Sequence, residues 1–385
     1  MRSNPLATAL VALLCCAARP AWAVEGPFVP ADDAQVVETL RTRPLDRGEQ
    51  EWRDWRAQLR ATPDALPVAL RVAQRAIEIG RRDGDPRDLG IAQAALAPWW
   101  SLAAPPVEVR LLKAVVLQST HAFGPALDEL DAVLRAAPGN AQAWLTQASI
   151  LQVQGRTTEA ARSCQRVRAL GATLYADACL AELAGLTGRA DMAAALLTRL
   201  ARDASAAAPA WLQLMRAELD ERRGDAAAAE VLFKAALAPG PDAYTLGAYA
   251  DFLLDQGRPA EVVPLLRDAQ RVDALLLRLA LAYQALRRPE TDAAVAALQM
   301  RFDAARLRGD IVHRREEARF LLQLRQRPEA ALQVALQNWA VQKEPADARL
   351  VLAAARAAHD DPAAEPVRSA LRASGLVDRR LQGLL

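Results

Sequence analysis

The sequence predicts an all-α protein, and three observations support that prediction. Hydrophobic residues make up 52% of the 385 residues but aromatics only 5%, because alanine and leucine supply most of the apolar side chains. Together with arginine these are strong helix formers. The high apolar fraction, beside 24% charged residues, excludes a disordered chain. Finally, glycines recur at a spacing of 33 to 36 residues within segments of helical periodicity, which is typical of a repeat architecture.

The first 23 residues have the layout of a secretory signal peptide. Arg2 precedes an apolar run at residues 6–18, and Ala21-Trp22-Ala23 forms a small-x-small cleavage site. We therefore expect cleavage after Ala23 and a periplasmic mature protein. An uncleaved anchor is the alternative, although the run is shorter than the roughly 20 residues that span a bilayer. Cys15 and Cys16 lack the small residue that precedes a lipidated cysteine.

Residues 24–63 are expected to form an N-terminal helical cap. Helices are predicted over residues 32–41 and 46–61, without a clear repeat. The terminal repeats of a solenoid must cover an open hydrophobic end. We expect four tryptophans to do so here, with stacking on a carbohydrate or anchoring of a partner as the alternative: Trp52, Trp55, Trp99 and Trp100.

The central part of the chain carries the repeat. Gly155, Gly188, Gly224 and Gly257 are spaced 33, 36 and 33 residues apart. An acidic residue follows each glycine, where negative charge suits a helix N-terminus, and the glycine can adopt the left-handed conformation that ends a helix. Each unit is therefore a helix–turn–helix of about 34 residues. The small or apolar residues around each glycine are the expected core: Ala148, Ala181, Ala217 and Ala250 seven residues before, Ala160, Ala193, Ala229 and Val262 five residues after.

This pattern resembles the tetratricopeptide repeat (TPR) family. Within residues 141–171 the family's aromatic, small, large, glycine, small and large positions hold Trp144, Ala148, Leu151, Gly155, Ala160 and Cys164. Residues 242–269 match nearly as well. The resemblance covers residues 64–385, with the best-formed repeats at 107–270 and divergent ones at 64–106 and 271–385. It implies a right-handed α-solenoid that follows the N-terminal cap.

The divergent repeats are expected to continue this register. His121 occupies the glycine position of the repeat before residue 141, and Ala280, Tyr283 and Arg287 fit a first helix. The run His-Arg-Arg-Glu-Glu at residues 313–317 is expected to lie on a solvated, charged helix face.

Enzyme motifs do not appear in the sequence. The three histidines are far apart, and there is no zinc-binding pair, Cys-x-x-Cys, G-x-S-x-G elbow or glycine-rich phosphate loop. We therefore predict no catalytic residue, no metal site, no cofactor and no enzyme. The 48 basic residues are balanced by 46 acidic ones without a basic stripe, which argues against a nucleic-acid ligand. The mature chain holds no other apolar run of membrane length, so stable membrane insertion is not expected.

The resemblance implies a scaffold or adaptor that binds a protein or peptide partner in a concave groove. The preference for Arg over Lys fits a bacterial genome rich in GC, and the signal peptide indicates export. A non-catalytic subunit of an envelope assembly or export complex remains an alternative, and an enzyme acting on cell-wall material is a remote one. The oligomeric state stays open, including end-to-end stacking of copies.

In such solenoids the first helix of each hairpin lines the concave side. The residue after each buried alanine then points to the groove, and residues one turn further on join it. The predicted lining is an acidic strip edged by aromatics, with a solvated face as the alternative: Ser149, Gln152, Tyr175, Glu182, Trp211, Glu218, Glu221, Arg222, Tyr244, Asp251 and Asp255.

Two cysteines remain after the signal peptide. Cys164 and Cys179 lie symmetrically about the helix–helix turn near Gly171, so an antiparallel pair of helices would put them at the same height. A disulfide and two buried thiols are both compatible with this placement.

Overall fold

The computed structural model describes residues 30, 32, 34–36, 38, 46–203 and 208–385, and every regular element in these ranges is a helix. The predicted signal peptide at residues 1–23 lies outside the described part. In the predicted helix at residues 32–41, the described residues are bends, turns or irregular backbone. The predicted helix at residues 46–61 is confirmed as α1 (Arg47–Ala61).

The remaining helices follow one another with short connections. The N-terminal part contains α2 (Leu66–Asp83), α3 (Pro86–Ala95), α4 (Ala97–Trp100), α5 (Val107–Ser119), α6 (Phe123–Ala136), α7 (Ala141–Val153), α8 (Thr157–Ala169), α9 (Thr173–Leu186) and α10 (Ala190–Asp203). The middle contains α11 (Ala210–Arg223), α12 (Ala226–Leu237), α13 (Ala243–Asp255), α14 (Pro259–Leu266), α15 (Asp273–Ala285) and α16 (Glu290–Arg308). The C-terminal part contains α17 (Arg314–Arg319), the π-helical turn η1 (Phe320–Leu324), α18 (Pro328–Trp339), α19 (Pro345–Ala357), the 3₁₀ turn η2 (Asp361–Ala364), α20 (Glu365–Ser374) and the 3₁₀ turn η3 (Arg379–Leu381).

From α2 onward the described helices form nine consecutive hairpins. A residue with φ between +52° and +85° ends the first helix of each hairpin. Non-glycine residues rarely adopt this left-handed conformation, so four of the nine turns are strained. His121 occupies its position as predicted, whereas Arg287, expected inside a first helix, lies in the turn after α15. The nine turn residues are Gly84, His121, Gly155, Gly188, Gly224, Gly257, Arg287, Gln326 and His359.

The small residues of the repeat form the core between the helices. Each predicted core alanine or valine has no solvent exposure, because a residue without a long side chain lets two helix backbones approach closely. Larger side chains fill the remaining space, notably Phe233, Phe252, Phe302 and Phe320. The small residues that recur in the sequence are therefore the residues at which the helices of the solenoid pack together.

The four N-terminal tryptophans pack as predicted. Trp52 and Trp55 of α1, and Trp99 and Trp100 of α4, all pack against the first hydrophobic cluster, which includes Val72 and other residues of α2, α3 and α5. They cover the end of the first hairpin, in agreement with a capping role.

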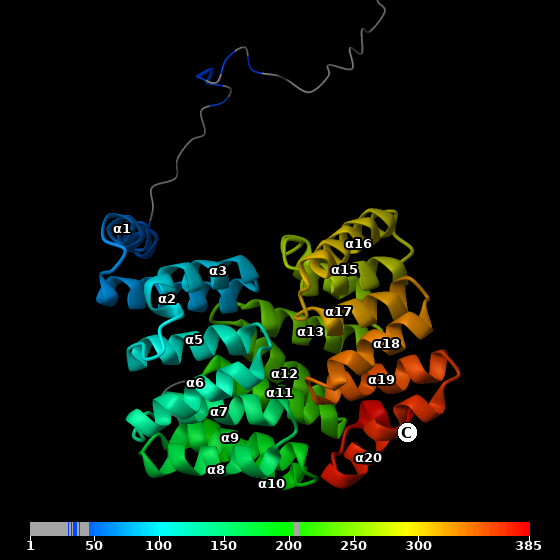
Figure 1. Cartoon of the computed structure of the whole chain (residues 1–385). Coiled ribbons are helices and arrows are strands. Elements are labelled where there is room, and N and C mark those ends of the chain that lie inside the picture. Colours follow the sequence, from blue (N-terminus) through cyan, green and yellow to red (C-terminus); the bar gives the residue numbers. More distant parts are fainter. Residues whose placement is uncertain (1–29, 31, 33, 37, 39–45, 204–207) are drawn as a thin grey trace, which may run out of the picture. The chain divides into compact units, whose positions relative to one another are not determined.

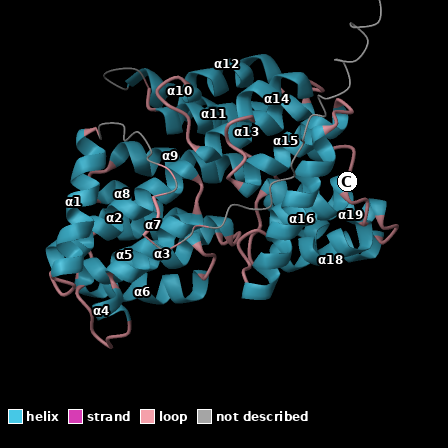
Figure 2. Cartoon of the chain, turned by 90° about the horizontal axis from the view of Figure 1, so that it is seen from above, coloured by secondary structure: helices cyan, strands magenta, loops and turns pink. Residues whose placement is uncertain are grey.

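Residues Glu51–Leu385 form one compact unit in which the solenoid curves back on itself. The stack from α2 to α10 and the stack from α15 to α20 lie side by side (Figure 1), and α11 to α14 connect them at the back, as the view from above shows (Figure 2). Turns of the first stack contact the second. The backbone N–H of Lys343 donates to the carbonyl of Val153 at 2.7 Å, and a Cβ added at Gly188 would lie 2.9 Å from the carbonyl oxygen of Gly375.

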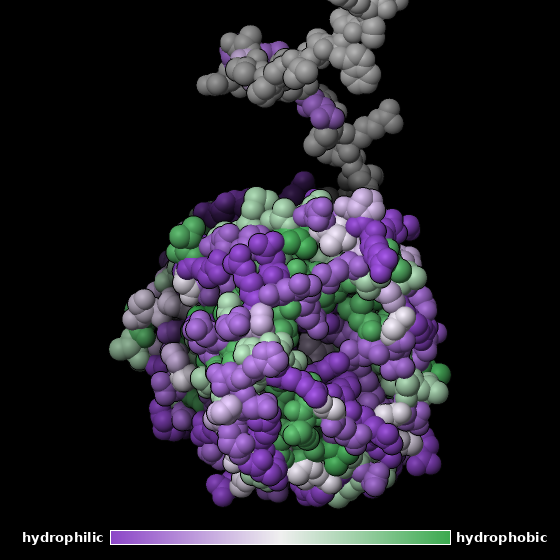
Figure 3. Space-filling view, turned by 90° about the vertical axis from the view of Figure 1, so that its right-hand side faces the viewer, coloured by the Kyte–Doolittle hydropathy of each residue, from purple (hydrophilic) through white to green (hydrophobic). Residues whose placement is uncertain are grey.

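The outer face of the C-terminal stack is mostly hydrophilic, with apolar side chains showing in smaller areas between the polar ones (Figure 3). No helix in the described ranges combines the length and the apolar character needed to cross a bilayer.

A disulfide connects two neighbouring hairpins. Cys164 of α8 and Cys179 of α9 are bonded, with their Cα atoms 6.0 Å apart. Of the two arrangements compatible with the sequence, the structure has the bridge. It ties the second helix of one repeat to the first helix of the next.

Candidate binding cavity

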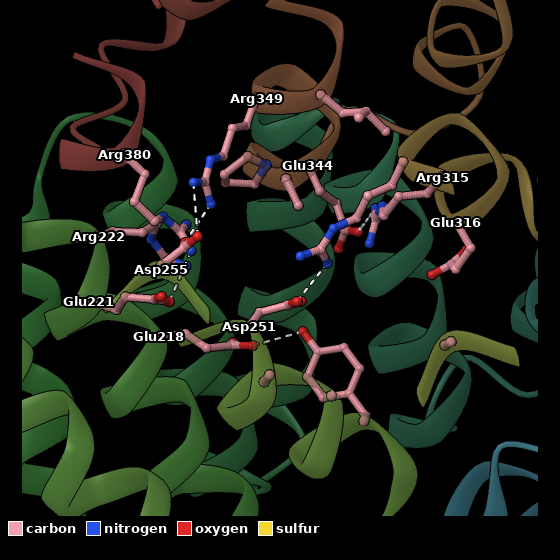
Figure 4. A pocket seen from close by; sticks show the side chains of 18 of the residues that line it. Glu218, Glu221, Arg222, Asp251, Asp255, Arg315, Glu316, Glu344, Arg349 and Arg380 are labelled. Carbon is pink, nitrogen blue, oxygen red and sulfur yellow. Dashed lines mark hydrogen bonds and ion pairs between the residues drawn. The ribbon is translucent and has the colours of Figure 1, made fainter. Parts of the chain in front are cut away.

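A cavity of about 330 Å³ lies on the concave side of the solenoid. One wall comes from α9, α11 and α13, and the opposite wall from α15, α17, α19 and the segment around η3 (Figure 4). The curvature of the solenoid therefore places first helices from its two halves on opposite sides of one partly open cavity.

Eight of the eleven residues predicted for the groove line this cavity: Gln152, Glu182, Glu218, Glu221, Arg222, Tyr244, Asp251 and Asp255. These residues face the cavity because the residue after a buried alanine points away from the core of its helix pair. Ser149, Tyr175 and Trp211 are not part of the lining. Ser149 is exposed and accepts a hydrogen bond from Gln118 at 3.1 Å, and the rings of Tyr175 and Trp211 stack on each other at 5.6 Å.

Arginines from the C-terminal half reach the predicted acidic residues. Asp251 accepts from Arg278 and from Arg319 of α17, which is 68 positions away in the sequence. Arg349 of α19 donates to Asp255 at 3.0 Å. The cavity lining contains seven acidic and seven basic side chains, so the expected acidic strip faces basic residues of the C-terminal half that the sequence reasoning did not include.

Residues 313–317 do not form the solvated charged face expected from the sequence. Arg315 bonds to Asp347, whose side chain has no solvent exposure, and also to Glu344. Glu317 is buried and accepts from Arg306 at 3.0 Å. The expectation failed because this short helix packs against α18 and α19, and its charged side chains pair with Arg306 of α16 and Asp347 of α19.

The same cavity holds carboxyl groups with very different proton affinities. Burial alone would raise the pKa of Asp251, but the guanidinium groups of Arg278 and Arg319 hold it at about 2. Removal from bulk water raises the pKa of Glu218 to about 7, and the nearby charge of Glu182 adds to this. Burial likewise raises the pKa of Glu221 to about 7, against the opposing effect of Arg380.

The end of the cavity between α9 and α11 has unpaired polar atoms. We call this the acidic end and define it by Glu182, Glu218, Glu221 and Arg222. Within the described part of the chain, Oε2 of Glu182, Oε1 of Glu221 and Nε of Arg222 are buried without a hydrogen-bond partner. Tyr244 donates its hydroxyl to Oε1 of Glu218 at 2.9 Å, while 62% of its surface remains accessible.

The lining is suited to binding polar ligands. Charged side chains, two glutamines and the Tyr244 ring contribute to it beside small and apolar residues, and no Ser, Thr, Cys or His from the described ranges does. No group of three His, Cys, Asp or Glu side chains in those ranges is arranged to hold a metal ion.

The fold and the cavity together define the class of protein. It is an all-α solenoid of helix–turn–helix repeats with a charge-balanced cavity on its concave side.

No protein-family model matches the sequence, and no curated protein does either. Similar solved structures include the APC/C hetero-tetramer Cut9–Hcn1, with a TM-score of 0.45 and 17% identity over 80% of this chain and 59% of that chain. Another is Naa15/Naa10 bound to HypK, with a TM-score of 0.30 and 15% identity over 85% of this chain and 60% of that one.

A third similar structure is the TPR domain of P58(IPK), with a TM-score of 0.21 and 14% identity over 74% of this chain and 98% of that chain. The present chain spans less than two thirds of the length of the first two structures. Because the highest of the three TM-scores is 0.45, none of these similarities carries an argument about function.

Proposed function

We propose that this protein is a non-catalytic TPR-like scaffold that binds a segment of a protein partner in the cavity of its solenoid. The observation that carries the proposal is the cavity itself, which lies between two halves of one chain and contains three buried polar atoms that lack a partner among the described residues. Binding sites are typically preformed concave spaces with a few convergent polar groups.

The cavity volume of about 330 Å³ is at the lower end of the range of ligand-binding pockets. We propose that one or two side chains of the partner segment enter this space.

We further propose that the protein acts in the bacterial periplasm. The charged start, apolar run and small-x-small site of residues 1–23 support export, and the Cys164–Cys179 disulfide suits an oxidising compartment. Cell fractionation followed by N-terminal sequencing tests this. A periplasmic chain that begins at Val24 is expected, whereas a cytoplasmic chain that retains Met1 contradicts export.

Capture of a partner tests the binding function. Ala346 lies at the start of α19, is exposed and lines the cavity, so Ala346→Trp should fill the entrance without disturbing the core. Ala227→Trp places the same side chain on an exposed position of α12 outside the cavity and serves as the control. Pull-down from periplasmic extract should recover a partner with the wild type and with Ala227→Trp, and lose it with Ala346→Trp. Equal recovery with all three proteins would place the binding site elsewhere.

A further inference from the structure

The unpaired atoms at the acidic end identify the chemistry of the bound segment. We propose that the carboxylates of Glu182, Glu218 and Glu221 bind the ammonium or guanidinium group of a lysine or arginine side chain of the partner. In the same complex, Nε of Arg222 donates to a backbone carbonyl of that basic segment. This inference rests on the proposed function, because it assigns a chemical class to the segment that enters the cavity.

The carboxylates have unused capacity to accept hydrogen bonds. Glu221 uses Oε2 for Arg380 at 2.9 Å, and Glu182 uses Oε1 for Arg222 at 3.3 Å. Their other oxygens are buried without a partner in the described part of the chain, and the side chain of Glu221 is only 9% exposed. A buried carboxylate oxygen without a donor is costly, and a cation in the cavity supplies donors to several such oxygens at once.

When its three carboxyl groups are ionised, the acidic end also carries excess negative charge. Its three carboxylates face two guanidinium groups, those of Arg222 and Arg380, and Arg380 is shared with Asp378 at 2.7 Å. At the other end of the cavity, Asp251 is already paired with two arginines. A cationic group of a ligand is therefore attracted most strongly to the acidic end.

One feature favours a peptide over a simple amine. The side chain of Arg222 is 6% exposed and its Nε has no acceptor among the described residues, so the ligand must offer an acceptor as well as a cation. A peptide has backbone carbonyls, whereas a polyamine has none. The accessible ring of Tyr244 beside Glu218 adds a surface on which a cation can stack.

Binding of a cation should release protons. In the empty cavity the pKa values of Glu218 and Glu221 lie at about 7, mainly because both groups are removed from bulk water. A bound cation favours the ionised carboxylates and lowers these values, so the complex should tighten as the pH rises from 6 to 8. The charged and titratable groups that act on these two glutamates come from α9, α11, α13 and η3 with its flanks: Glu182, Arg222, Tyr244, Asp251, Asp255, Asp378 and Arg380.

Isothermal titration calorimetry on the purified protein tests the inference. The probes are an acetylated and amidated Gly-Arg-Gly-Lys-Gly peptide, its counterpart with Glu and Asp in place of the basic residues, and spermidine. We expect the basic peptide to bind at least about tenfold more tightly than the acidic one, and to gain about tenfold in affinity between pH 6 and pH 8. Raised salt should weaken it.

A matched pair of variants isolates the acidic end. Glu182→Gln, Glu218→Gln and Glu221→Gln together should weaken the basic peptide at least about tenfold and remove the pH dependence. The control changes three highly exposed acids outside the cavity by the same charge, Asp191→Asn, Asp268→Asn and Asp361→Asn, and should bind like the wild type. Circular dichroism of both triple variants confirms that they fold.

Three outcomes would overturn the inference. Equal weakening in both triple variants would show non-specific attraction to the surface, and spermidine binding as tightly as the peptide would remove the role of Arg222. If no peptide binds while Ala346→Trp still abolishes capture from extract, the basic segment is wrong and the proposed function stands. If capture is also unaffected by Ala346→Trp, both proposals fail.

Discussion

The ionised carboxylate of Glu221 should destabilise the fold, so its removal should be stabilising at alkaline pH only. Its side chain is 9% exposed and burial raises its pKa from 4.5 to about 7. Between these values the unfolded chain loses the proton while the folded chain retains it, so the free energy of unfolding falls as the pH rises. A shift of about 2.5 units at 1.36 kcal/mol per unit amounts to about 3 kcal/mol.

Glu221→Gln keeps the shape of the side chain and an oxygen that can accept from Arg380. At pH 8 we expect the variant to be more stable than the wild type by about 2–3 kcal/mol, since the cost of the buried charge is gone. At pH 5 the wild-type glutamate is already protonated in the folded state, so the two proteins should differ little.

Urea titrations followed by circular dichroism at pH 5 and pH 8 measure this difference. The free energy of unfolding of each protein is obtained by linear extrapolation at each pH. At each pH the free energy of unfolding of the wild type is subtracted from that of the variant, and the two results are then compared. Any contribution of the substitution that does not depend on pH cancels in this comparison.

Asp251→Asn provides the opposite case in the same cavity. Burial acts to raise its pKa, but Arg278 and Arg319 hold it at about 2, below the ordinary 3.8, so the ionised group stabilises the fold. That contribution is present above pH 4 and is lost only as the pH falls through about 2. The variant should therefore lose about 2 kcal/mol equally at pH 5 and pH 8.

An equal effect of Glu221→Gln at both pH values, or a loss of stability at pH 8, would refute the prediction. Either result would mean that Glu221 ionises without cost, with the cavity solvated enough to remove the effect of burial.

Three further predictions concern stability, each measured by urea titration. The Cys164–Cys179 disulfide closes a loop with a sequence separation of 15, so reduction should cost about 3 kcal/mol; no change on adding reductant would contradict this. Phe252→Ala removes a fully buried ring that packs 5.3 Å from the ring of Phe233, which should cost about 3–5 kcal/mol, and a loss below about 1 kcal/mol would exclude a core position for this ring. His359 is exposed at φ +55°, so His359→Gly should raise the urea midpoint by relieving about 1 kcal/mol of strain, whereas a lowered midpoint would show that the turn is not strained.

The hairpin repeats could be predicted because their signals are local. A glycine that ends one helix, an acid that starts the next and small residues seven before and five after the glycine all act within one hairpin. The divergent repeats were harder to place, because Arg287, Gln326 and His359 occupy left-handed turns without the glycine that marks such positions. In those turns packing of the adjacent helices outweighs the preference of the turn residue.

Part of the cavity could be predicted for the same reason. The residue after a core alanine must point away from the core, and Glu182, Glu218 and Asp251, which follow such alanines, line the cavity. The rule does not predict which residues of the second half of the solenoid lie opposite these side chains. Ser149 satisfies it too, yet it lies outside the cavity because the second half of the solenoid does not enclose that part of the first.

The sequence by itself determined the all-α class, the helix–turn–helix unit and the inward face of the first helices, because all three depend on residues within about 40 positions of one another. Only the tertiary structure decided which charged side chains form ion pairs with one another. Glu221 meets Arg380 across 159 positions and Asp255 meets Arg349 across 94. Such pairs depend on the small rotation between successive repeats, which accumulates along the solenoid until its two halves face each other.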